Sequence, residues 1–161
     1  MPMPSHLYLE GLKQGKIEGS CDQQGREGSI LVQALNHDVF IPRDPQSGQP
    51  TGKRVHNPMT ITKVFDASSP KLFQALSTGE RFKTVELKFF RINETGNEEH
   101  YYTIKLENAI LVSVKSYYPN CLDASFGSYG HMEDLSFTYE KIIWTWQPDG
   151  IEAEDSWKVP V

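Results

Sequence analysis

The amino-acid sequence predicts a mainly β domain with one short α-helix, most simply a small β-barrel or a sandwich. Three observations support this fold class: two long runs alternate apolar and polar residues, a polar turn joins them, and one segment carries helix signals at both ends. The chain has 161 residues, enough for one domain with a sizeable core and too few for two. It shows no internal repeat, low-complexity tract or linker, so residues 1–161 are expected to form a single domain.

Short runs of strand-forming residues predict the first strands. In chain order they are Leu7–Glu10, Ile30–Gln33, Val39–Ile41 and Met59–Phe65. Between the last two lies a polar stretch, RDPQSGQPTGKRVHNP, which runs from Arg43 to Pro58 and holds three prolines and two glycines. Connections in compact domains are usually about 4–6 residues long. A segment of this length is therefore either a spare loop or a working part of the protein.

One segment, SSPKLFQALSTGE, has the signals of a helix at both ends. Ser69 can cap it, Pro70 fits the first helical position, and Gly79 suits the C-terminal stop. The expected apolar face consists of Leu72, Phe73 and Leu76. Because the helix is short, it is stable only when it packs on the sheet.

The strongest periodic signal predicts a long hairpin, Thr84–Ile92 and Tyr101–Lys115, joined by the turn sequence ETGNEE. In the second strand the apolar residues of one parity are Tyr102, Ile104, Leu106, Ile110, Val112 and Val114. In the first strand Val85, Leu87 and Phe89 are expected to point inward. Strands usually stop near 10 residues. We therefore expect a bend near Glu107–Asn108, as at the corner of a barrel.

A last strand is predicted at Leu135–Trp146, where the apolar residues change parity at Lys141. That change indicates either a β-bulge or a strand buried on both faces. Phe90 and Ile92 likewise place apolar groups on the face opposite the inward residues of their strand. In a domain this small, burial on both faces requires a helix lid or a neighbouring subunit.

Composition excludes several classes of protein. The net charge is −5 and no cluster of Lys and Arg is present, so the electrostatic footprint of a nucleic-acid binder is missing. The sequence contains no run of 18 apolar residues, which a membrane-spanning helix would need, and its first residues lack the pattern of a signal peptide. Cys21 and Cys121 are expected to be free thiols, because a protein made in the cytoplasm is kept reduced.

No credible active site emerges from the sequence. His37 and Asp38 can be interpreted as a general base with its orienting carboxylate, but such a pair is more often a polar turn between strands. The carboxylates of Glu152, Glu154 and Asp155 suit a glycosidase only across a cleft, and a solvated tail is the commoner meaning. Neither metal-ligand spacing nor a phosphate-binding loop is present. We therefore expect no enzyme activity, cofactor or metal.

Four aromatic residues follow the long hairpin and leave a second interpretation open. They are Tyr117, Tyr118, Phe126 and Tyr129. Aromatic side chains at this density can form a ligand platform, although packing in a core or an interface is the commoner use. The alternative function is therefore a monomeric β-barrel module that binds carbohydrate.

Several stretches together resemble one protein family. They are MPMPSHLYLEG, KQGKIEG, DPQSGQPTGKRVHNPMTITKVFDASSPKLFQALSTGE, TVELKFFRI, EEHYYTIKLENAILVSVK, PNC and FTYEKIIWTW. The family is that of the haemolysin-coregulated protein (Hcp), the tube subunit of bacterial type VI secretion. The resemblance spans nearly the whole chain, and its DPQSGQPTG and LENA elements are not generic short motifs.

The resemblance implies a fold, an assembly and a set of partners. The fold would be a β-barrel of two sheets with a helix packed alongside. Six copies would form a hexameric ring, and the rings would stack into a tube that a contractile sheath propels from the cell. A spike protein would cap the tube, and small effector proteins would travel in its lumen. The protein would be made in the bacterial cytoplasm and secreted without a cleaved signal peptide.

The resemblance also gives the polar stretch Arg43–Pro58 a role as an assembly arm. Prolines fix φ, so such an arm loses less entropy on docking than a flexible loop does. We expect it to lie across a neighbouring subunit or the next ring, with Arg43, Gln46, Gln49 and Arg54 as hydrogen-bond donors. The candidate residues are Arg43, Asp44, Pro45, Gln46, Ser47, Gly48, Gln49, Pro50, Thr51, Arg54 and His56. The alternative is a disordered loop in solvent.

Overall fold

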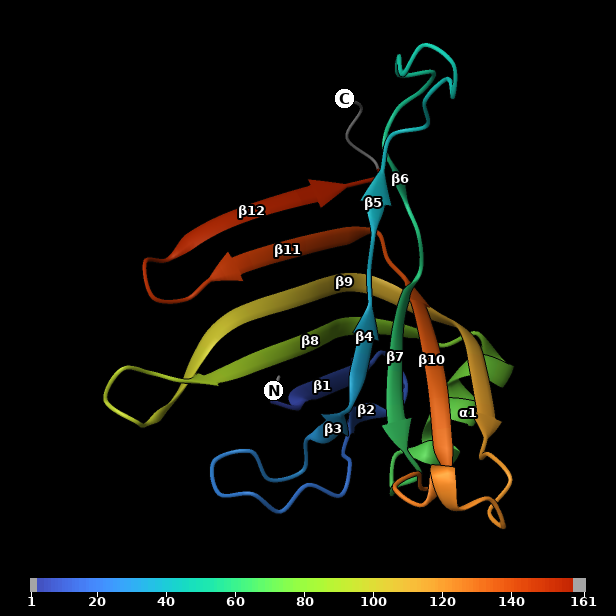
Figure 1. Ribbon diagram of the computed structural model, residues 1–161, viewed down its shortest axis with the longest axis vertical. Helices are drawn as coiled ribbons and strands as arrows, with labels where there is room; N and C mark the ends of the chain where they lie inside the picture. The colour runs from blue at the N-terminus through green and yellow to red at the C-terminus, as the bar shows by residue number, and fades with distance from the viewer. Residues whose placement is uncertain (1–2, 158–161) are drawn as a thin grey trace.

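A computed structural model describes residues 3–157 as a strongly bent sheet with one α-helix and a projecting hairpin (Figure 1). The strands are β1 (Ser5–Gly11), β2 (Gly15–Ile17), β3 (Ile30–Val32), β4 (Ala34–Asn36), β5 (Val39–Phe40), β6 (Val55–His56), β7 (Met59–Val64), β8 (Arg81–Ile92), β9 (Glu98–Tyr117), β10 (Met132–Thr138), β11 (Lys141–Trp146) and β12 (Ile151–Ser156). The helix α1 covers Ser69–Thr78, and a 3-10 turn covers Ala124–Phe126. The mainly β class with one helix is therefore confirmed.

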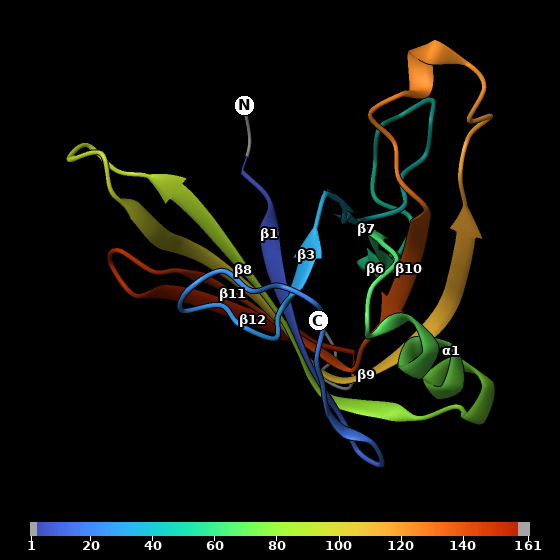
Figure 2. The ribbon, with the colours of Figure 1, turned by 90° about the horizontal axis from the view of Figure 1, so that it is seen from below.

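The sheet has two wings that share β9. The strand order is β2-β1-β8-β9-β10-β7-β4, with β3 paired to β1 and the β11–β12 hairpin attached to β9. We call β1, β2, β8, β11, β12 and the first half of β9 the large wing. The small wing is the second half of β9 with β10, β7 and β4, and Figure 2 shows β9 running through both. Within residues 3–157 the strand path does not close, so the expected β-barrel is not observed.

The bend predicted in β9 is confirmed at Asn108, whose φ of 50° is the one left-handed value outside glycine in the described residues. Asn tolerates this conformation better than most residues. The turn of the backbone also changes which parity faces the core. Ala109 and Leu111 are buried beyond the bend, whereas Ile110 and Val112, which we expected inside, face outward. A strict alternation of inward and outward residues along the strand could not predict this change of parity at Asn108.

The predicted strand Leu135–Trp146 is in fact two strands, separated at Tyr139 and Glu140. β10 pairs with the second half of β9, and β11 pairs with its first half. The chain thus passes from the small wing to the large wing at the point where its apolar parity changes. The parity change reflects this crossing, and neither a bulge nor burial on both faces is needed to explain it.

The ends of α1 follow local sequence signals. Ser68, one residue before the expected Ser69, occupies the N-cap position, and its side chain makes no capping hydrogen bond. Pro70 lies in the first turn, where its missing N–H costs nothing. Gly79 ends the helix with φ of 67°, as its sequence position predicted.

The buried face of α1 differs from the prediction at one residue. Leu72 and Ala75 are buried in the core, and Leu76 packs partly against it. Phe73 is 40% exposed, because it lies one residue round the helix from the buried stripe. The core itself lies between the two wings and includes residues from β1, β3, β7, β8, β9, β10, β11 and α1.

A buried ion network ties the start of α1 to the small wing. Lys63 on β7 has a fully buried side chain, and its ammonium lies 2.5 Å from Glu133 Oε2 and 3.1 Å from Asp66 Oδ1. It also donates to Ser69 Oγ at 3.2 Å, and that hydroxyl donates in turn to Glu133 at 3.0 Å. We call Lys63, Asp66, Ser69 and Glu133 the buried network. One ammonium lies between two carboxylates, so each buried charge has an opposite charge beside it.

Phe90 shows how the outer face of the large wing is covered. The guanidinium of Arg26, from the loop between β2 and β3, lies 3.6 Å from the centre of the Phe90 ring. Arg26 also pairs with Glu98 at 2.5 Å, and His6 meets Phe90 edge-on at 5.4 Å. The lid over Phe90 is thus a loop of the same chain, whereas we expected a helix or a neighbouring subunit. Ile92 remains exposed.

Candidate assembly site

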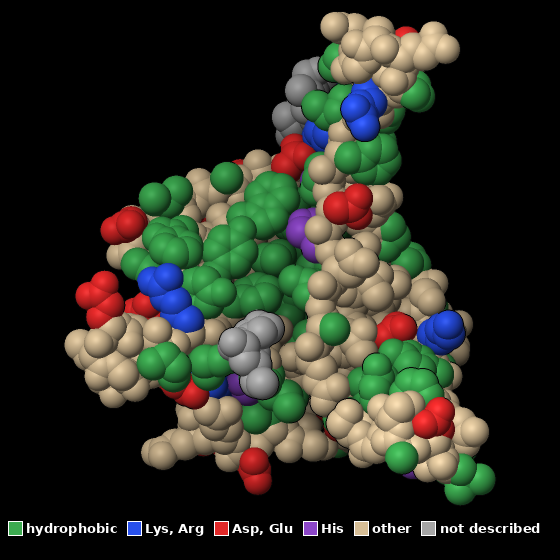
Figure 3. Space-filling view, viewed as in Figure 1, with side chains coloured by type: hydrophobic (Ala, Val, Ile, Leu, Met, Phe, Trp, Pro, Cys, Tyr) green, Lys and Arg blue, Asp and Glu red, His purple; other side chains and the backbone are tan. Residues whose placement is uncertain are grey.

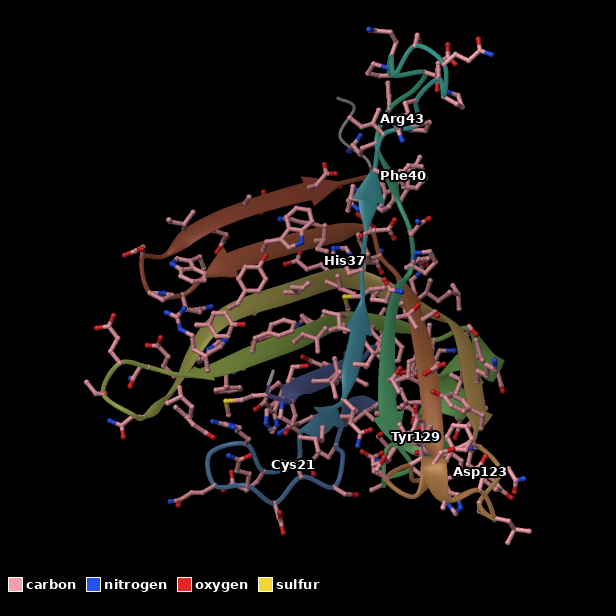
Figure 4. The ribbon with its side chains drawn as sticks, viewed as in Figure 1. Cys21, His37, Phe40, Arg43, Asp123 and Tyr129 are labelled. Atoms are coloured by element: carbon pink, nitrogen blue, oxygen red, sulfur yellow. The ribbon has the colours of Figure 1, made fainter. Side chains whose placement is uncertain are left out.

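The polar stretch forms a projecting hairpin, which we call the arm and define as residues 39–56. Its strands β5 and β6 pair antiparallel, and an isolated bridge between Arg43 and Pro50 continues the pairing toward the tip. The arm extends beyond the end of the large wing (Figure 1). Figure 4 places Phe40 and Arg43 along it, at the opposite end of the molecule from Asp123 and Tyr129. The arm is therefore an ordered element of the fold.

Short-range hydrogen bonds order the tip of the arm. The Asp44 carboxylate accepts from the Gln46 amide at 3.0 Å and from the Ser47 hydroxyl at 3.0 Å. These bonds lower the pKa of Asp44. The Asp44 amide donates to the Gln49 carbonyl at 2.8 Å, and Gly48 adopts a φ of 75° that favours glycine. The tip is thus held by its own sequence and makes its turn without help from a partner.

At its base the arm is joined to the large wing by a group that we call the clasp. Arg54 donates two hydrogen bonds to the Asp155 carboxylate, at 2.7 and 2.9 Å, and a third to the carbonyl of Ser156 at 2.8 Å. His56 lies 2.6 Å from the same carboxylate through Nε2 and 2.8 Å from the Tyr139 hydroxyl through Nδ1. Bidentate pairing of this kind fixes direction as well as distance.

The electrostatics of the clasp follow from these contacts. Hydrogen bonds from Arg54 and His56 lower the pKa of Asp155 to about 2. Those from Arg54 have the largest effect and outweigh the opposing effect of burial. Burial raises the pKa of the Tyr139 hydroxyl, and the Asp155 charge adds to that effect. Asp155 is therefore ionised and Tyr139 is neutral at physiological pH. Arg54 and His56, two of the residues proposed for assembly, thus have partners within their own chain.

The inner face of the large wing carries three rows of apolar residues, each row running directly across paired strands. Two rows belong to the core, in which Trp144 alone is only partly buried: Ile142, Leu106, Val85 and Leu9, then Trp144, Ile104, Leu87 and Leu7. The third is Ile151, Trp146, Tyr102 and Phe89, which we call the open row. Side chains directly opposite one another share a face, so the open row continues the core surface beyond the small wing. Figure 3 shows this apolar surface over β8, β9 and β11.

A groove of about 560 Å³ separates the large wing from the edge of the small wing beside the open row. Phe89, Ile92 and Tyr101 line one side, and Gln33 and Leu35 line the other. Arg91 lies over the rings of Tyr101 and Trp146, with its guanidinium 4.8 and 5.1 Å from their centres. The surface is therefore aromatic, partly open and bordered by one cation, which suits an interface better than solvent.

Comparison with known proteins identifies the family. A family model described as "Type VI secretion system effector, Hcp" matches residues 7–146. The chain belongs to the Hcp family. It is 47% identical to the "Major exported protein" of Pseudomonas aeruginosa, an alignment that covers 100% of this chain and 99% of that protein. The resemblance stated from sequence is thereby confirmed.

Solved Hcp structures share the fold. The chain is similar to a variant of the Hcp1 protein from the Escherichia coli pathovar EAEC 042, with 38% identity, a TM-score of 0.85 and coverage of 96% and 99% of the two chains. It is also similar to the secreted protein Hcp3 of Pseudomonas aeruginosa, with 38% identity, a TM-score of 0.79 and coverage of 97% and 99%. The Hcp fold thus extends over nearly the whole chain.

The prediction of a solvated tail at Glu152, Glu154 and Asp155 was wrong. These residues form β12, which pairs along its whole length with β11. Glu152 and Glu154 alternate with Ile151 and Ala153, an apolar period of two that could have revealed the strand. The acidic composition concealed it, because strands at a sheet edge commonly carry charge.

His37 and Asp38 do not form the base and orienting carboxylate considered from sequence. The His37 ring packs 6.3 Å from Trp144 and 6.5 Å from Tyr139, and its buried Nδ1 has no hydrogen-bond partner within the described residues. Burial lowers its pKa, and the nearby His56 adds to the effect. The Asp38 carboxylate instead accepts from the Asn57 amide at 2.9 and 3.0 Å. His37 is thus a packing residue beneath the arm.

The aromatic residues of the carbohydrate alternative are only partly brought together. Tyr118, Phe126 and Tyr129 line a shallow pocket of about 250 Å³ in the loop between β9 and β10. Tyr117 is directed elsewhere, and its hydroxyl lies 3.3 Å from the Asp134 carboxylate. Phe126 and Tyr129 meet edge-on at 5.7 Å, so their faces are not aligned to stack a sugar ring.

Residues 3–157 offer neither a metal-binding cluster nor a membrane-spanning helix. No group of three His, Cys, Asp or Glu side chains in that range is placed to hold a metal ion. The one helix in this range is too short and too polar to span a bilayer. Cys21 and Cys121 are both free, as the sequence analysis expected.

Proposed function

We propose that this chain is a structural subunit of the type VI secretion tube. Six copies form a hexameric ring, and the rings stack into a tube that is secreted. Membership of the Hcp family supports this role, as does the likeness over the full length to a protein named for being exported. The role is structural rather than enzymatic.

The observation that carries the proposal is the pairing of an ordered, projecting arm with an open apolar row on one chain. In a single copy Ile151 of the open row is exposed and the other three members are only half-buried, although the row continues the core surface. An arm and a receptive face at different places on one subunit suit a heterologous interface, which closes into a ring when its rotation allows. The fold thus has the two unlike surfaces that a ring needs.

The remaining partners follow from the same role. A contractile sheath surrounds the tube, a spike protein sits at its tip, and small effector proteins are carried in the lumen. The tube subunit is made in the bacterial cytoplasm and leaves the cell without a cleaved signal peptide. Neither nucleic acid nor membrane insertion has a part in this function.

The mass of the protein in solution tests the proposal. One chain has a mass of 18.3 kDa, so a hexamer has a mass of about 110 kDa, six times that of the chain. We expect light scattering after size exclusion to give the hexamer mass, and electron microscopy of the same fraction to show annular particles. A dilution series provides the control, because a specific ring keeps its mass until it dissociates to a folded monomer.

A folded monomer at every concentration would contradict the ring. That outcome would favour the monomeric carbohydrate-binding module, and a glycan array would then test the pocket around Tyr118 and Tyr129 directly. Particles of mixed mass without annular shape would indicate apolar aggregation through the open row rather than a closed assembly.

A further inference from the structure

We propose that the loop between β2 and β3 is an acid-sensitive lid, which opens when the imidazole of His6 takes up a proton. The loop consists of residues 18–29, and we call it the lid. It covers Phe90 on the outer face of the large wing through Arg26, whose guanidinium lies 3.6 Å from the centre of the Phe90 ring. The proposal concerns contacts within one chain and does not depend on the ring.

The tip of the lid is attached to the large wing through Arg26. The Arg26 side chain is only 12% exposed, and it pairs with Glu98 on β9 at 2.5 Å. Gln23 adds a longer hydrogen bond to the same carboxylate at 3.5 Å. The base of the lid is held separately, by backbone bonds within the loop and by a bond from the Ala67 amide to the Ser20 hydroxyl. Release of Arg26 would therefore free the tip of the lid while its base stays in place.

The contacts of His6 determine which of its ring nitrogens carries the proton. His6 lies on β1 beneath the lid and is 2% exposed. Its Nε2 lies 3.4 Å from the Arg26 guanidinium, and because a guanidinium can only donate, this nitrogen must accept. Nδ1 then carries the proton and donates to the Ser29 hydroxyl at 2.9 Å. The closed lid thus requires a neutral imidazole.

Protonation of His6 would oppose the closed lid in two ways. A proton on Nε2 would place a donor against the Arg26 donor and a positive charge beside the positive charge of Arg26. It would also leave a charged ring buried under the lid, which is costly. Burial accordingly lowers the pKa of His6, and the Arg26 charge adds to that effect, while the Glu98 charge acts against it.

The other elements packed against His6 do not offer an unused carboxylate to a protonated ring. The charged and titratable groups around it are Cys21 and Arg26 of the lid, Glu86 and Lys88 of β8, and Glu98 and His100 of β9. On the other side of β1, β3 consists of apolar residues and adds no charge. Glu98 is paired with Arg26, and Glu86 lies 3.5 Å from Lys88, the strand partner of His6. A proton on His6 therefore enters a cluster whose carboxylates already have partners.

The direction of the pH effect follows from the lowered pKa of His6. Once the lid is open, the imidazole is in water and titrates near its ordinary value of 6.5. The open form therefore binds the proton more tightly than the closed form does. The closed lid is fully favoured above pH 6.5 and becomes less favoured as the pH falls below that value. Acid would thus uncover the ring of Phe90 and the thiol of Cys21, which lies in the lid (Figure 4).

Hydrogen exchange followed by mass spectrometry tests the lid in the full chain. We expect the exchange rate of peptides from residues 18–29, corrected for the intrinsic rate, to rise about fivefold or more between pH 7.5 and pH 5.0. Peptides of β8 should keep their protection at both values. His6→Gln retains a donor and an acceptor but cannot take up a proton, so it should abolish the rise. His131→Gln is the matched control, since His131 is exposed in the loop before β10.

Two results of this experiment would overturn the proposal. One is a lid whose corrected exchange rate does not change with pH in the wild type, or still rises in His6→Gln. The other is a rise that disappears in His100→Gln, because the response would then belong to the second imidazole beside Phe90, whose ring centre lies 5.3 Å away.

Glu98→Gln keeps the proposal open to refutation if His6→Gln does not fold. This change removes the anion that holds Arg26, so the lid should already exchange several-fold faster at pH 7.5. A lid that stays as protected as in the wild type would contradict the role of Arg26, on which the proposal depends.

Thiol labelling with dithiodipyridine, which also reacts with thiols at acid pH, provides an independent measurement. Cys21 is partly buried in the lid, 3.8 Å from the Nδ1 of His6, and the exposed Cys121 serves as the internal reference. We expect the labelling rate of Cys21 divided by that of Cys121 to rise about fivefold in the wild type between pH 7.5 and pH 5.0, and to stay level in His6→Gln. A ratio that stays constant in the wild type would show that the lid does not open in acid, and would refute the proposal.

Discussion

The buried network and the clasp use the same chemistry for different purposes. In the buried network, Lys63 and Glu133 have side chains that are 0% and 1% exposed, whereas in the clasp Arg54 and Asp155 are 15% and 25% exposed. The first pair joins two strands and a helix inside one wing. The second joins an arm to the edge of another wing. A low dielectric strengthens both the attraction between charges and the penalty for an unpaired charge. The ion pair in the buried network therefore stabilises the fold, whereas the more exposed pair in the clasp only sets the direction of the arm.

Removing one partner of the buried network should give the largest effect. We expect Glu133→Gln to lower the free energy of unfolding by about 3–5 kcal/mol, because the ammonium of Lys63 stays buried with less compensation. Urea unfolding followed by circular dichroism measures the change. The exposed pair Lys16 and Glu18, at 3.3 Å, provides the control.

Glu18→Gln should change the same quantity by only about 0–1 kcal/mol, the usual range for surface pairs. If Glu133→Gln behaved like this control, the buried network would not hold the small wing to α1. Lys63→Met with Glu133→Leu sharpens the test. Removing both charges together should cost less than removing Glu133 alone, since the fully buried ammonium is then removed as well and only the Asp66 carboxylate, held by hydrogen bonds from Ser68, keeps its charge.

Breaking the clasp should have a smaller and more local effect. Asp155→Asn removes the charge that Arg54 and His56 share, so the arm should open more often while the core stays closed. Hydrogen exchange followed by mass spectrometry should show several-fold faster exchange in residues 39–56. The peptides of β8 and β9 should exchange as in the wild type. Acceleration in both regions would mean that the clasp supports the fold, and the contrast with the buried network would fail.

Local signals in the sequence predicted local structure correctly. Pro70 and Gly79 mark the two ends of α1, and a turn at residues 93–97 joins the two longest strands, so that only Glu98 and Glu99 of the expected ETGNEE turn belong to β9 instead. The bend near Asn108 followed from strand length alone. These features depend on residues close together in the chain, so a pattern of turn formers and breakers contains the information needed to place them.

Features that depend on distant pairing were missed. Arg54 and Asp155 are 101 residues apart in sequence, and no spacing rule joins them. The division of Leu135–Trp146 into two strands depends on which half of β9 each one meets. The sequence marked residues 43–58 as a long polar segment, but it could not show that Arg54 and His56 contact Asp155 within the same chain. The open row likewise depends on strand register, which places Trp146 directly opposite Tyr102 and which the sequence alone does not give.

The pH dependence of the clasp should be the smallest effect and the most specific. The pKa of Asp155 is about 2 in the fold against an ordinary value of 3.8. The unfolded or opened chain therefore binds the proton more tightly than the closed fold does. The stabilising contribution of this carboxylate is fully present above pH 3.8 and is lost as the pH falls through about 2. We expect the ratio of arm exchange rates in Asp155→Asn and wild type, corrected for intrinsic rates, to be constant above pH 4 and to approach one below it. Asp149→Asn, in the turn beside β12, should give a ratio of one throughout.

A ratio that falls between pH 7 and pH 5 would contradict this assignment. It would place the pH dependence of the arm in His37, which packs beneath it, rather than in Asp155. His37 has its pKa lowered by burial, so protonation there opposes the fold increasingly as the pH falls below about 6.5. His37→Gln separates the two causes. If Asp155 alone governs the arm, His37→Gln should leave the ratio unchanged at every pH. If it flattens the change between pH 7 and pH 5, the packing of His37 against Trp144 and Tyr139 controls the arm.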